Sequence, residues 1–332
     1  MPNILWTGQR HCYDVHGNVI DCAGSGQDAA ARGNRTFQNR FIPEPNGLVR
    51  DGATNLVWTQ TANFGEFPMT WQDALDLVQA MNRDGYARYR DWRLPNRREL
   101  RSLISYGAKK PALPHSHPFE GVFLGWYWTS TTAAMAPDHA WYVHLEGGRM
   151  FYGKKDQFAL VWPVRGQSVH LPRTGQTTCH DSAGRNIPCA ASGGQDGALQ
   201  QGEPWPNPRF TVQGPVVHDH LTGLTWLGHA QVAPTTMTWK QALDHVAGLT
   251  TAGRSWRMPT INELESLVDA SAFSPALPAD HPFSDVHQAY WSSTSSFFQP
   301  DWAHVLYLDK GAVGVGWKPK PEFHAWPVSD SM

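Results

Sequence analysis

The sequence predicts two tandem α+β domains, each with two short helices followed by an antiparallel sheet with long loops. Three observations predict this fold class. A stretch of about 165 residues is written twice, each copy holds two helical patterns, and each copy then turns to aromatic and β-branched segments. We place the copies at 1–167 and 168–332. A period this long indicates tandem globular domains rather than a solenoid of small repeats.

Short motifs that recur in the same order carry the duplication. Their offset stays between 163 and 168 residues, as the following pairs show: Thr7-Gly8-Gln9 and Thr174-Gly175-Gln176, Met69-Thr70-Trp71 and Met237-Thr238-Trp239, Trp92-Arg93 and Trp256-Arg257, Tyr127-Trp128 and Tyr290-Trp291, and Trp162-Pro163-Val164 and Trp326-Pro327-Val328. Because the order and the spacing are both kept, we expect the two copies to share one fold and to differ mainly in their loops.

Two helices are predicted in each copy. Thr70 and Thr238 each precede apolar residues at helical spacing, which predicts a first helix that begins just after the threonine. Asn96 with Glu99, and Thr260 with Glu263, have the spacing of a capping box and predict the start of a second helix. In the first copy Leu100, Leu103 and Ile104 supply its buried stripe.

Strands are predicted after the helices. In the first copy the segments 127–131, 140–145 and 159–162 are aromatic or β-branched, as strands usually are. Gly147-Gly148 lies between two of them and predicts a hairpin turn.

Composition excludes several classes of protein. Charged residues make up 17% of the chain and aromatic residues 12%, whereas disordered chains are highly charged and poor in aromatic residues. The apolar runs are far shorter than the roughly 20 residues of a membrane helix, so we expect no membrane insertion. A formal net charge of −2 argues against a nucleic-acid partner.

The four cysteines are placed alike in the two copies. Nine residues of turn-like composition separate Cys12 from Cys22, and the same number separates Cys179 from Cys189. We expect a disulfide within each pair; a zinc site is the alternative, but the spacing does not resemble a zinc knuckle. Disulfides favour an oxidising, extracellular or cell-surface location. The residues from Met1 onward show no signal peptide, which we interpret as a leader removed rather than a cytosolic address.

The best-matched motifs resemble a known family. Thr-Gly-Leu-Thr-Trp (222–226), Thr-Trp-Lys-Gln-Ala-Leu (238–243), Trp-Arg-Met-Pro-Thr (256–260), Tyr-Trp-Ser-Ser-Thr (290–294) and Trp-Pro-Val (326–328) resemble the Lcl C-terminal domain family of bacteria, named after a collagen-like adhesin. The resemblance implies a C-type-lectin-like fold, related to that of the formylglycine-generating enzyme, and binding of sulfated glycans on host surfaces.

An enzyme is not expected. Formylglycine chemistry needs a reactive cysteine pair in the C-terminal part of the domain, yet no cysteine follows Cys189. The sequence also contains no metal-protease helix motif, nucleophile elbow, phosphate-binding loop or dinucleotide-binding glycine set. We therefore expect no catalytic residues, no metal and no cofactor.

The 16 tryptophans divide into matched and unmatched residues. Five pairs occupy matched places, as a shared core requires: Trp58 and Trp226, Trp71 and Trp239, Trp92 and Trp256, Trp128 and Trp291, and Trp162 and Trp326. Unmatched tryptophans are candidates for stacking on sugar rings, and we select Trp126, Trp141, Trp302 and Trp317. Ordinary local packing is the alternative for each of them.

Charge is unequal between the copies. Residues 1–167 hold 18 Lys and Arg against 15 Asp and Glu, a net +3, whereas residues 168–332 hold 9 against 14, a net −5. Arginine forks suit sulfate and carboxylate groups, so we select five ligand-binding candidates from the first copy: Arg88, Arg90, Arg97, Arg98 and Arg101. The last three are expected on the exposed side of the second helix. The alternative is a solvated helix face that only aids solubility.

These observations favour a non-enzymatic, secreted or surface-displayed binding module, an adhesin-like domain pair that recognises sulfated or acidic glycans through its first copy. The alternative is a structural or assembly subunit of a bacterial surface appendage or extracellular complex, whose unmatched tryptophans contact other surface proteins.

Overall fold

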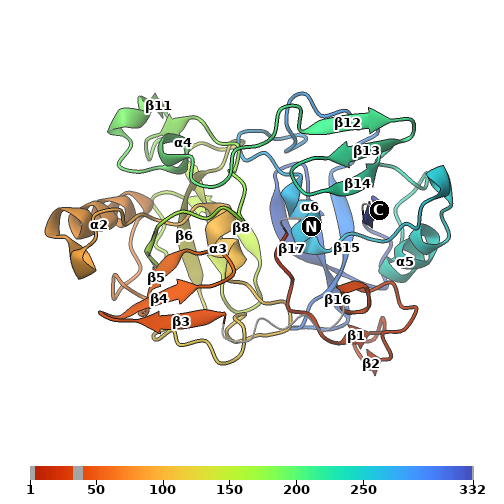
Figure 1. The fold of residues 1–332 in the computed structure, drawn as a ribbon, viewed down its shortest axis with the longest axis horizontal. Coiled ribbons are helices and arrows are strands. Elements are labelled where there is room, and N and C mark those ends of the chain that lie inside the picture. The colour runs from red at the N-terminus through yellow and green to blue at the C-terminus, as the bar shows by residue number, and fades with distance from the viewer. Residues whose placement is uncertain (1–3, 33–39, 331–332) are drawn as a thin grey trace. The chain divides into compact units, whose positions relative to one another are not determined.

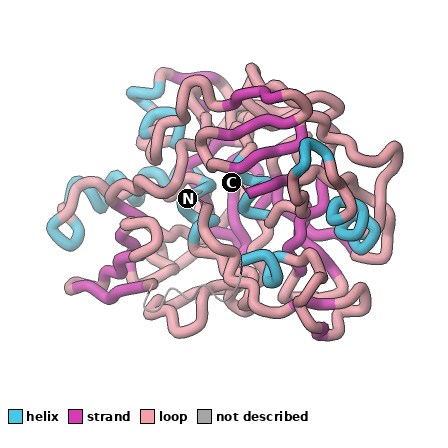
Figure 2. Tube along the Cα trace, turned by 45° about the vertical axis from the view of Figure 1, so that its right-hand side comes forward, coloured by secondary structure: helices cyan, strands magenta, loops and turns pink. Residues whose placement is uncertain are grey.

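A computed structural model describes residues 4–32 and 40–330, and its helices and strands repeat in the two halves of the chain (Figure 1). The fold is α+β, with few short helices and several antiparallel sheets. Long loops join these elements, as the tube in Figure 2 shows.

The first helix of each copy begins where the sequence predicts. These are α2 (Trp71–Asp84) and α5 (Trp239–Ala247). The side chain of Thr70 accepts a hydrogen bond from Asp73 N, and that of Thr238 accepts one from Gln241 N, so each threonine satisfies a backbone donor that the helix itself leaves without a partner. α2 is longer by five residues and ends at Gly85, which takes the left-handed conformation that glycine adopts without strain. The 3₁₀ turns η1 (Tyr86–Arg88) and η3 (Thr251–Gly253) follow.

The second helix of each copy is six residues long. α3 (Arg97–Ser102) and α6 (Ile261–Ser266) both open with the predicted capping box, in which the Glu99 or Glu263 side chain accepts a hydrogen bond from the backbone N–H of the cap residue. Leu100, Leu103 and Ile104 are buried, as their stripe predicts.

Each copy contains a set of three neighbouring antiparallel strands. The first is formed by β6 (Trp126–Thr132), β7 (His139–His144) and β8 (Met150–Lys154), and the second by β15 (Ala289–Ser295), β16 (Trp302–Tyr307) and β17 (Ala312–Trp317). The predicted hairpin turn at Gly147-Gly148 joins β7 to β8.

The predicted strand at 159–162 is wrong. Ala159 exchanges backbone hydrogen bonds with Met69, whereas Leu160 bonds to Trp126 and Trp128. The segment therefore divides its hydrogen bonds between two neighbours, one residue to each, and forms isolated bridges in place of a ladder.

Each copy also has a four-stranded antiparallel sheet that the sequence did not predict. The first runs in the order β3 (Phe41–Glu44), β4 (Leu48–Asp51), β5 (Val57–Thr59) and β9 (Val164–Arg165). The second runs in the order β12 (Phe210–Gln213), β13 (Val216–Asp219), β14 (Leu224–Leu227) and β18 (Val328–Asp330). The strands are short, and the last strand of each sheet, β9 or β18, lies about a hundred residues after the strand with which it pairs. Sequence pattern alone therefore does not reveal these sheets.

The tryptophan pairs form the cores. All ten matched residues are buried, and equivalent contacts recur: the indole N–H of Trp71 donates to Thr129 O at 2.7 Å, and that of Trp239 donates to Ser292 O at 2.7 Å. The prediction of a shared tryptophan core is confirmed.

Both predicted disulfides are present, Cys12–Cys22 and Cys179–Cys189. Each closes a small hairpin at the start of a copy: β1 (Cys12–Tyr13) with β2 (Val19–Ile20), and β10 (Cys179–His180) with β11 (Asn186–Ile187). A short helix completes the segment, α1 (Asp28–Arg32) or α4 (Asp196–Leu199), the latter preceded by η2 (Cys189–Ala191). We call residues 4–32 arm 1 and residues 171–199 arm 2.

The arms are exchanged between the copies. One compact unit contains arm 1 with residues 105–107 and the described part of 205–332, and the other contains residues 40–104 with 108–204, which include arm 2. The compact units therefore divide the chain differently from the sequence copies at 1–167 and 168–332. Each arm packs on the core of the other copy.

A buried aspartate anchors each arm. Asp196 Oδ2 accepts hydrogen bonds from Thr131 Oγ1 in β6 and from Thr174 Oγ1 in its own arm, both at 2.7 Å. Asp28 Oδ2 accepts one from Thr294 Oγ1 in β15 at 2.6 Å. Burial raises the pKa of Asp196 to about 6, against the lowering effect of the two hydroxyl donors.

A buried lysine forms a second anchor. Lys155 Nζ donates to His180 O at 3.0 Å and Asp181 O at 3.2 Å, and it lies 4.0 Å from the centre of the Trp71 ring. Lys318 Nζ makes the equivalent contacts with Tyr13 O, Asp14 O and the Trp239 ring. Burial lowers the pKa of both lysines to about 7.

Candidate functional site

The arginines predicted on the exposed side of α3 are mostly buried. Arg97 is 1% exposed and lies with its guanidinium carbon 4.2 Å from the centre of the Trp141 ring; Arg101 is 6% exposed and donates to Gly148 O. Only Arg98 is partly exposed. The expectation of exposure is wrong for Arg97 and Arg101 because α3 packs against β6 and β7, so this short helix has no broad solvent-facing side.

Arg88 and Arg90 are exposed, as a ligand contact requires. Both follow the C-terminal end of α2, where Arg83 is also exposed. Arg90 Nη1 donates to Asn82 O at 3.0 Å and Arg83 O at 2.8 Å, which satisfies carbonyl groups at the end of the helix. We call Arg83, Arg88 and Arg90 the α2-end surface.

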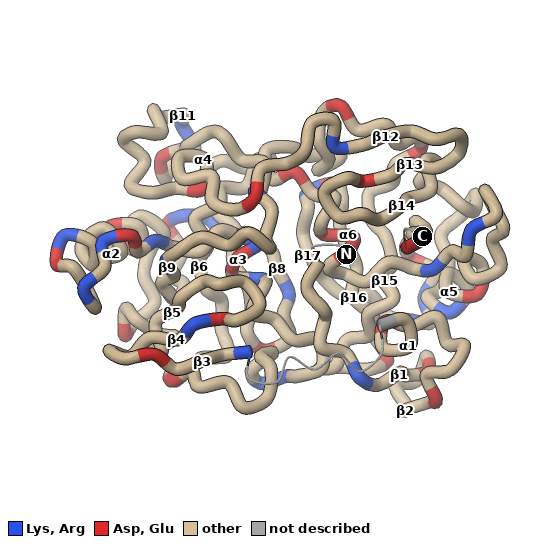
Figure 3. The backbone as a smooth tube through the Cα atoms, in the orientation of Figure 1, with Lys and Arg blue, Asp and Glu red and all other residues tan. Residues whose placement is uncertain are grey.

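Acidic residues are interspersed with this surface (Figure 3). Asp84 is exposed, and Asp91 Oδ1 accepts a hydrogen bond from Arg165 Nε at 2.8 Å. The Arg165 guanidinium also lies 3.4 Å from the centre of the Tyr89 ring. The α2-end surface is therefore moderately basic, and the shorter α5 leaves the second copy without its equivalent.

The four candidate tryptophans have different environments. Trp141 is buried, which removes it from any surface that a sugar could reach. Trp126 is half-buried and packs against Tyr142 and His144, with ring centres 4.1 and 4.6 Å away. Trp302 is also half-buried, whereas Trp317 is 44% exposed.

An exposed apolar surface lies in the first copy and was not predicted. It consists of Phe67, Phe123, Leu124 and Phe158, of which Phe67 is 75% and Phe158 is 71% exposed. The segment after Phe158 bonds both to Met69 and to Trp126, so the loops that carry these side chains are paired with one another. We call these four residues the aromatic surface. At the corresponding places in the second copy stand polar residues, such as Glu322 for Phe158 and His287 for Phe123.

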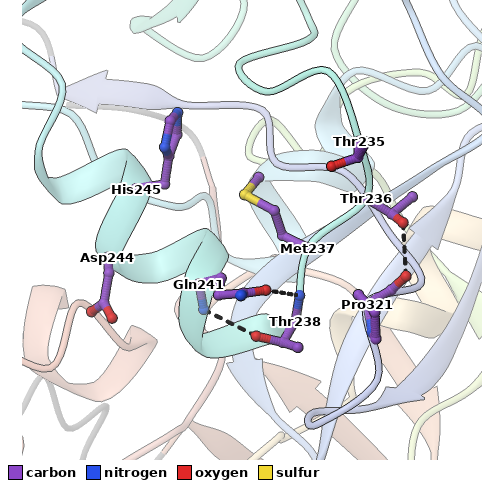
Figure 4. A pocket seen from close by; sticks show the side chains of 8 residues that line it. All are labelled: Thr235, Thr236, Met237, Thr238, Gln241, Asp244, His245 and Pro321. Carbon is purple, nitrogen blue, oxygen red and sulfur yellow. Dashed lines mark hydrogen bonds between the residues drawn. The ribbon is translucent and has the colours of Figure 1, made fainter.

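An open depression lies at the start of α5 in the second copy, with a volume of about 760 Å³ (Figure 4). Most of its lining residues are polar: Thr235, Thr236, Met237, Thr238, Gln241, Asp244, His245 and Pro321. The depression was not predicted from the sequence, because an exposed threonine or histidine carries no pattern of its own. The one available signal was that Thr235 and His245 stand where the first copy has Phe67 and Leu77.

Within the described ranges, 4–32 and 40–330, no three His, Cys, Asp or Glu side chains gather as a set that could hold a metal ion. Over the same ranges no helix is long and apolar enough to cross a bilayer.

Comparison with known proteins identifies the family. A search of curated proteins found no match. The model of the Lcl C-terminal domain matches residues 47–165 and 215–329, together more than two thirds of the chain. Both matches begin after the disulfide-bonded hairpins, and each covers one pair of predicted helices and most of the strands around it. The chain belongs to the Lcl C-terminal domain family and contains two tandem copies of that domain.

Proposed function

We propose that the chain is a non-enzymatic, extracellular or surface-displayed binding module of C-type-lectin-like fold, and that its first copy binds polyanionic glycans. The observation that carries this proposal is the α2-end surface, where three exposed arginines lie within eight residues of the first copy. The two disulfides support an oxidising compartment.

The chemistry of the α2-end surface fits sulfate and carboxylate groups. A guanidinium offers paired N–H donors in a plane, which match two oxygens of an anion. Arg83 and Arg88 present this group to solvent, whereas Arg90 is partly engaged by the end of α2. Because Asp84 and Asp91 offset part of the charge, we expect several anionic groups along one glycan chain to contribute, with binding weakened by salt.

The test is a pair of matched variants on heparin, a sulfated glycan. The double variant with Arg83→Ala and Arg88→Ala should elute from immobilised heparin at a clearly lower salt concentration than the unmodified chain, because two exposed charges are lost. Lys240→Ala removes an exposed charge from α5 in the second copy and should elute unchanged. Arg90 is kept because it bonds to the end of α2. Equal elution of all three proteins would refute the proposal.

A specific observation favours a second function. The aromatic surface leaves large apolar side chains in water, and such surfaces commonly mark contacts with other proteins. A structural or assembly subunit would use the aromatic surface for such contacts. Phe67→Ser with Phe158→Ser should then reduce self-association, measured by light scattering during gel filtration, and raising the salt concentration should not. If the unmodified chain stays monomeric at high concentration in this assay, self-assembly through the aromatic surface is refuted.

A further inference from the structure

We infer that the depression at the start of α5 is a binding site for one neutral sugar residue or a polyol of similar size. It lies in the second copy, and the inference does not rest on the proposed binding of polyanionic glycans by the first copy. Several lining residues still offer hydrogen-bonding atoms to a ligand once their contacts with one another are made.

Two lining residues are left as donors. Gln241 Oε1 accepts from Thr238 N at 3.0 Å, which fixes the amide and leaves its two N–H groups to donate. Thr238 Oγ1 accepts from Gln241 N at 3.3 Å, which leaves its own O–H group to donate. This capping box therefore holds both donors in place before a ligand arrives (Figure 4).

Two other lining residues are left as acceptors. Thr236 Oγ1 donates to Pro321 O at 2.7 Å, so its lone pairs are available to accept. His245 Nε2 lies 3.0 Å from Val232 O. Since a carbonyl oxygen can only accept, Nε2 carries a hydrogen in this contact, and in the Nε2–H tautomer Nδ1 is left to accept. The Thr235 hydroxyl, which can do either, is directed toward Met237 in Figure 4.

A mixed set of fixed donors and acceptors matches a polyol, because each sugar hydroxyl both donates and accepts. Met237 and Pro321 add apolar surface for the C–H groups of a sugar ring. Asp244 lies on the lining and pairs with Lys240 at 2.6 Å, so these two charges offset each other. Because the pair offers no excess positive charge to attract sulfate or phosphate, the ligand we infer is neutral.

The first copy supplies the substitutions for a test. Phe67, Pro68 and Leu77 occupy the places of Thr235, Thr236 and His245, so the equivalent spot there cannot offer the same hydrogen bonds. Thr235→Phe with His245→Leu installs two of the first-copy residues at exposed positions of the second copy, where fold stability should change little.

The experiment uses the full chain and the methyl glycosides of glucose, galactose, mannose and N-acetylglucosamine, with binding followed by saturation-transfer NMR and calorimetry. We expect at least one glycoside to bind, and the double variant to bind it about tenfold more weakly or not at all, as the loss of two hydrogen bonds predicts. Inorganic sulfate should not compete.

Two controls separate this site from the α2-end surface. Lys240→Ala, next to the depression, and Arg83→Ala with Arg88→Ala, in the first copy, should both keep glycoside binding. Each variant is first compared with the unmodified chain by thermal unfolding. The inference is overturned if none of the four glycosides binds, if the double variant binds as well as the unmodified chain, or if sulfate displaces the glycoside.

Discussion

Substitution of Thr131 by valine should release arm 2 from the first core. Thr131 Oγ1 donates to the buried Asp196 Oδ2 at 2.7 Å and accepts from Arg97 N at 3.0 Å, so valine keeps the shape but removes both interactions. A hydrogen bond to a charged group contributes about 1.5–3 kcal/mol, and depriving a buried backbone N–H of its acceptor costs about 1–3 kcal/mol. Thr174 still donates to Asp196, so we expect a loss of about 3–5 kcal/mol.

The second copy provides a matched variant. Thr294→Val removes the donor to Asp28 Oδ2 at 2.6 Å and the acceptor of Ile261 N at 3.1 Å, and should release arm 1 instead. Urea unfolding followed by tryptophan fluorescence measures the loss, and hydrogen exchange read by mass spectrometry shows which arm opens. Thr235→Val, at an exposed position, is the control and should change stability by less than about 0.5 kcal/mol.

Because the arms are exchanged, each substitution should open the arm that belongs to the other copy. Thr131→Val should raise exchange in residues 171–199 and Thr294→Val in residues 4–32. A loss below about 1 kcal/mol in both variants, or faster exchange in the arm of the same copy as the mutation, would refute the reasoning.

Three further predictions concern other buried groups. The pKa of Asp196 is raised from 3.8 to about 6 on folding, so the folded chain binds more protons than the unfolded chain between these pH values. The free energy of unfolding should therefore fall as the pH rises from about 4 to about 6. Asp196→Asn should flatten this dependence on pH, measured by urea titration. Cys179→Ser with Cys189→Ser should lower stability by about 2–3 kcal/mol, measured by thermal unfolding under oxidising conditions. Arg97→Ala should cost more than about 2 kcal/mol and Arg88→Ala less than about 0.5 kcal/mol, because only Arg97 is buried; equal urea midpoints would contradict the assigned burial.

The sequence by itself determined the features that depend on neighbouring residues or on comparison of the two copies. Caps at Thr70, Asn96 and Thr260 begin helices because a side-chain oxygen reaches a backbone N–H three residues on. The disulfides join cysteines ten positions apart. The buried tryptophans were predicted because a duplicated chain repeats its core.

Only the tertiary structure decided which surfaces face water and which segments meet. Arg97 and Arg101 have the sequence of an exposed basic helix, but contacts with β6, with β7 and with the turn after β7 bury them. The depression at α5 brings Pro321 to Thr236 across 85 residues. Asp28 meets Thr294 across 266 positions, while Asp196 meets Thr131 in the other copy. The two arms and the two cores carry matching anchors, so local sequence does not distinguish the two pairings, and the structure shows the exchanged one.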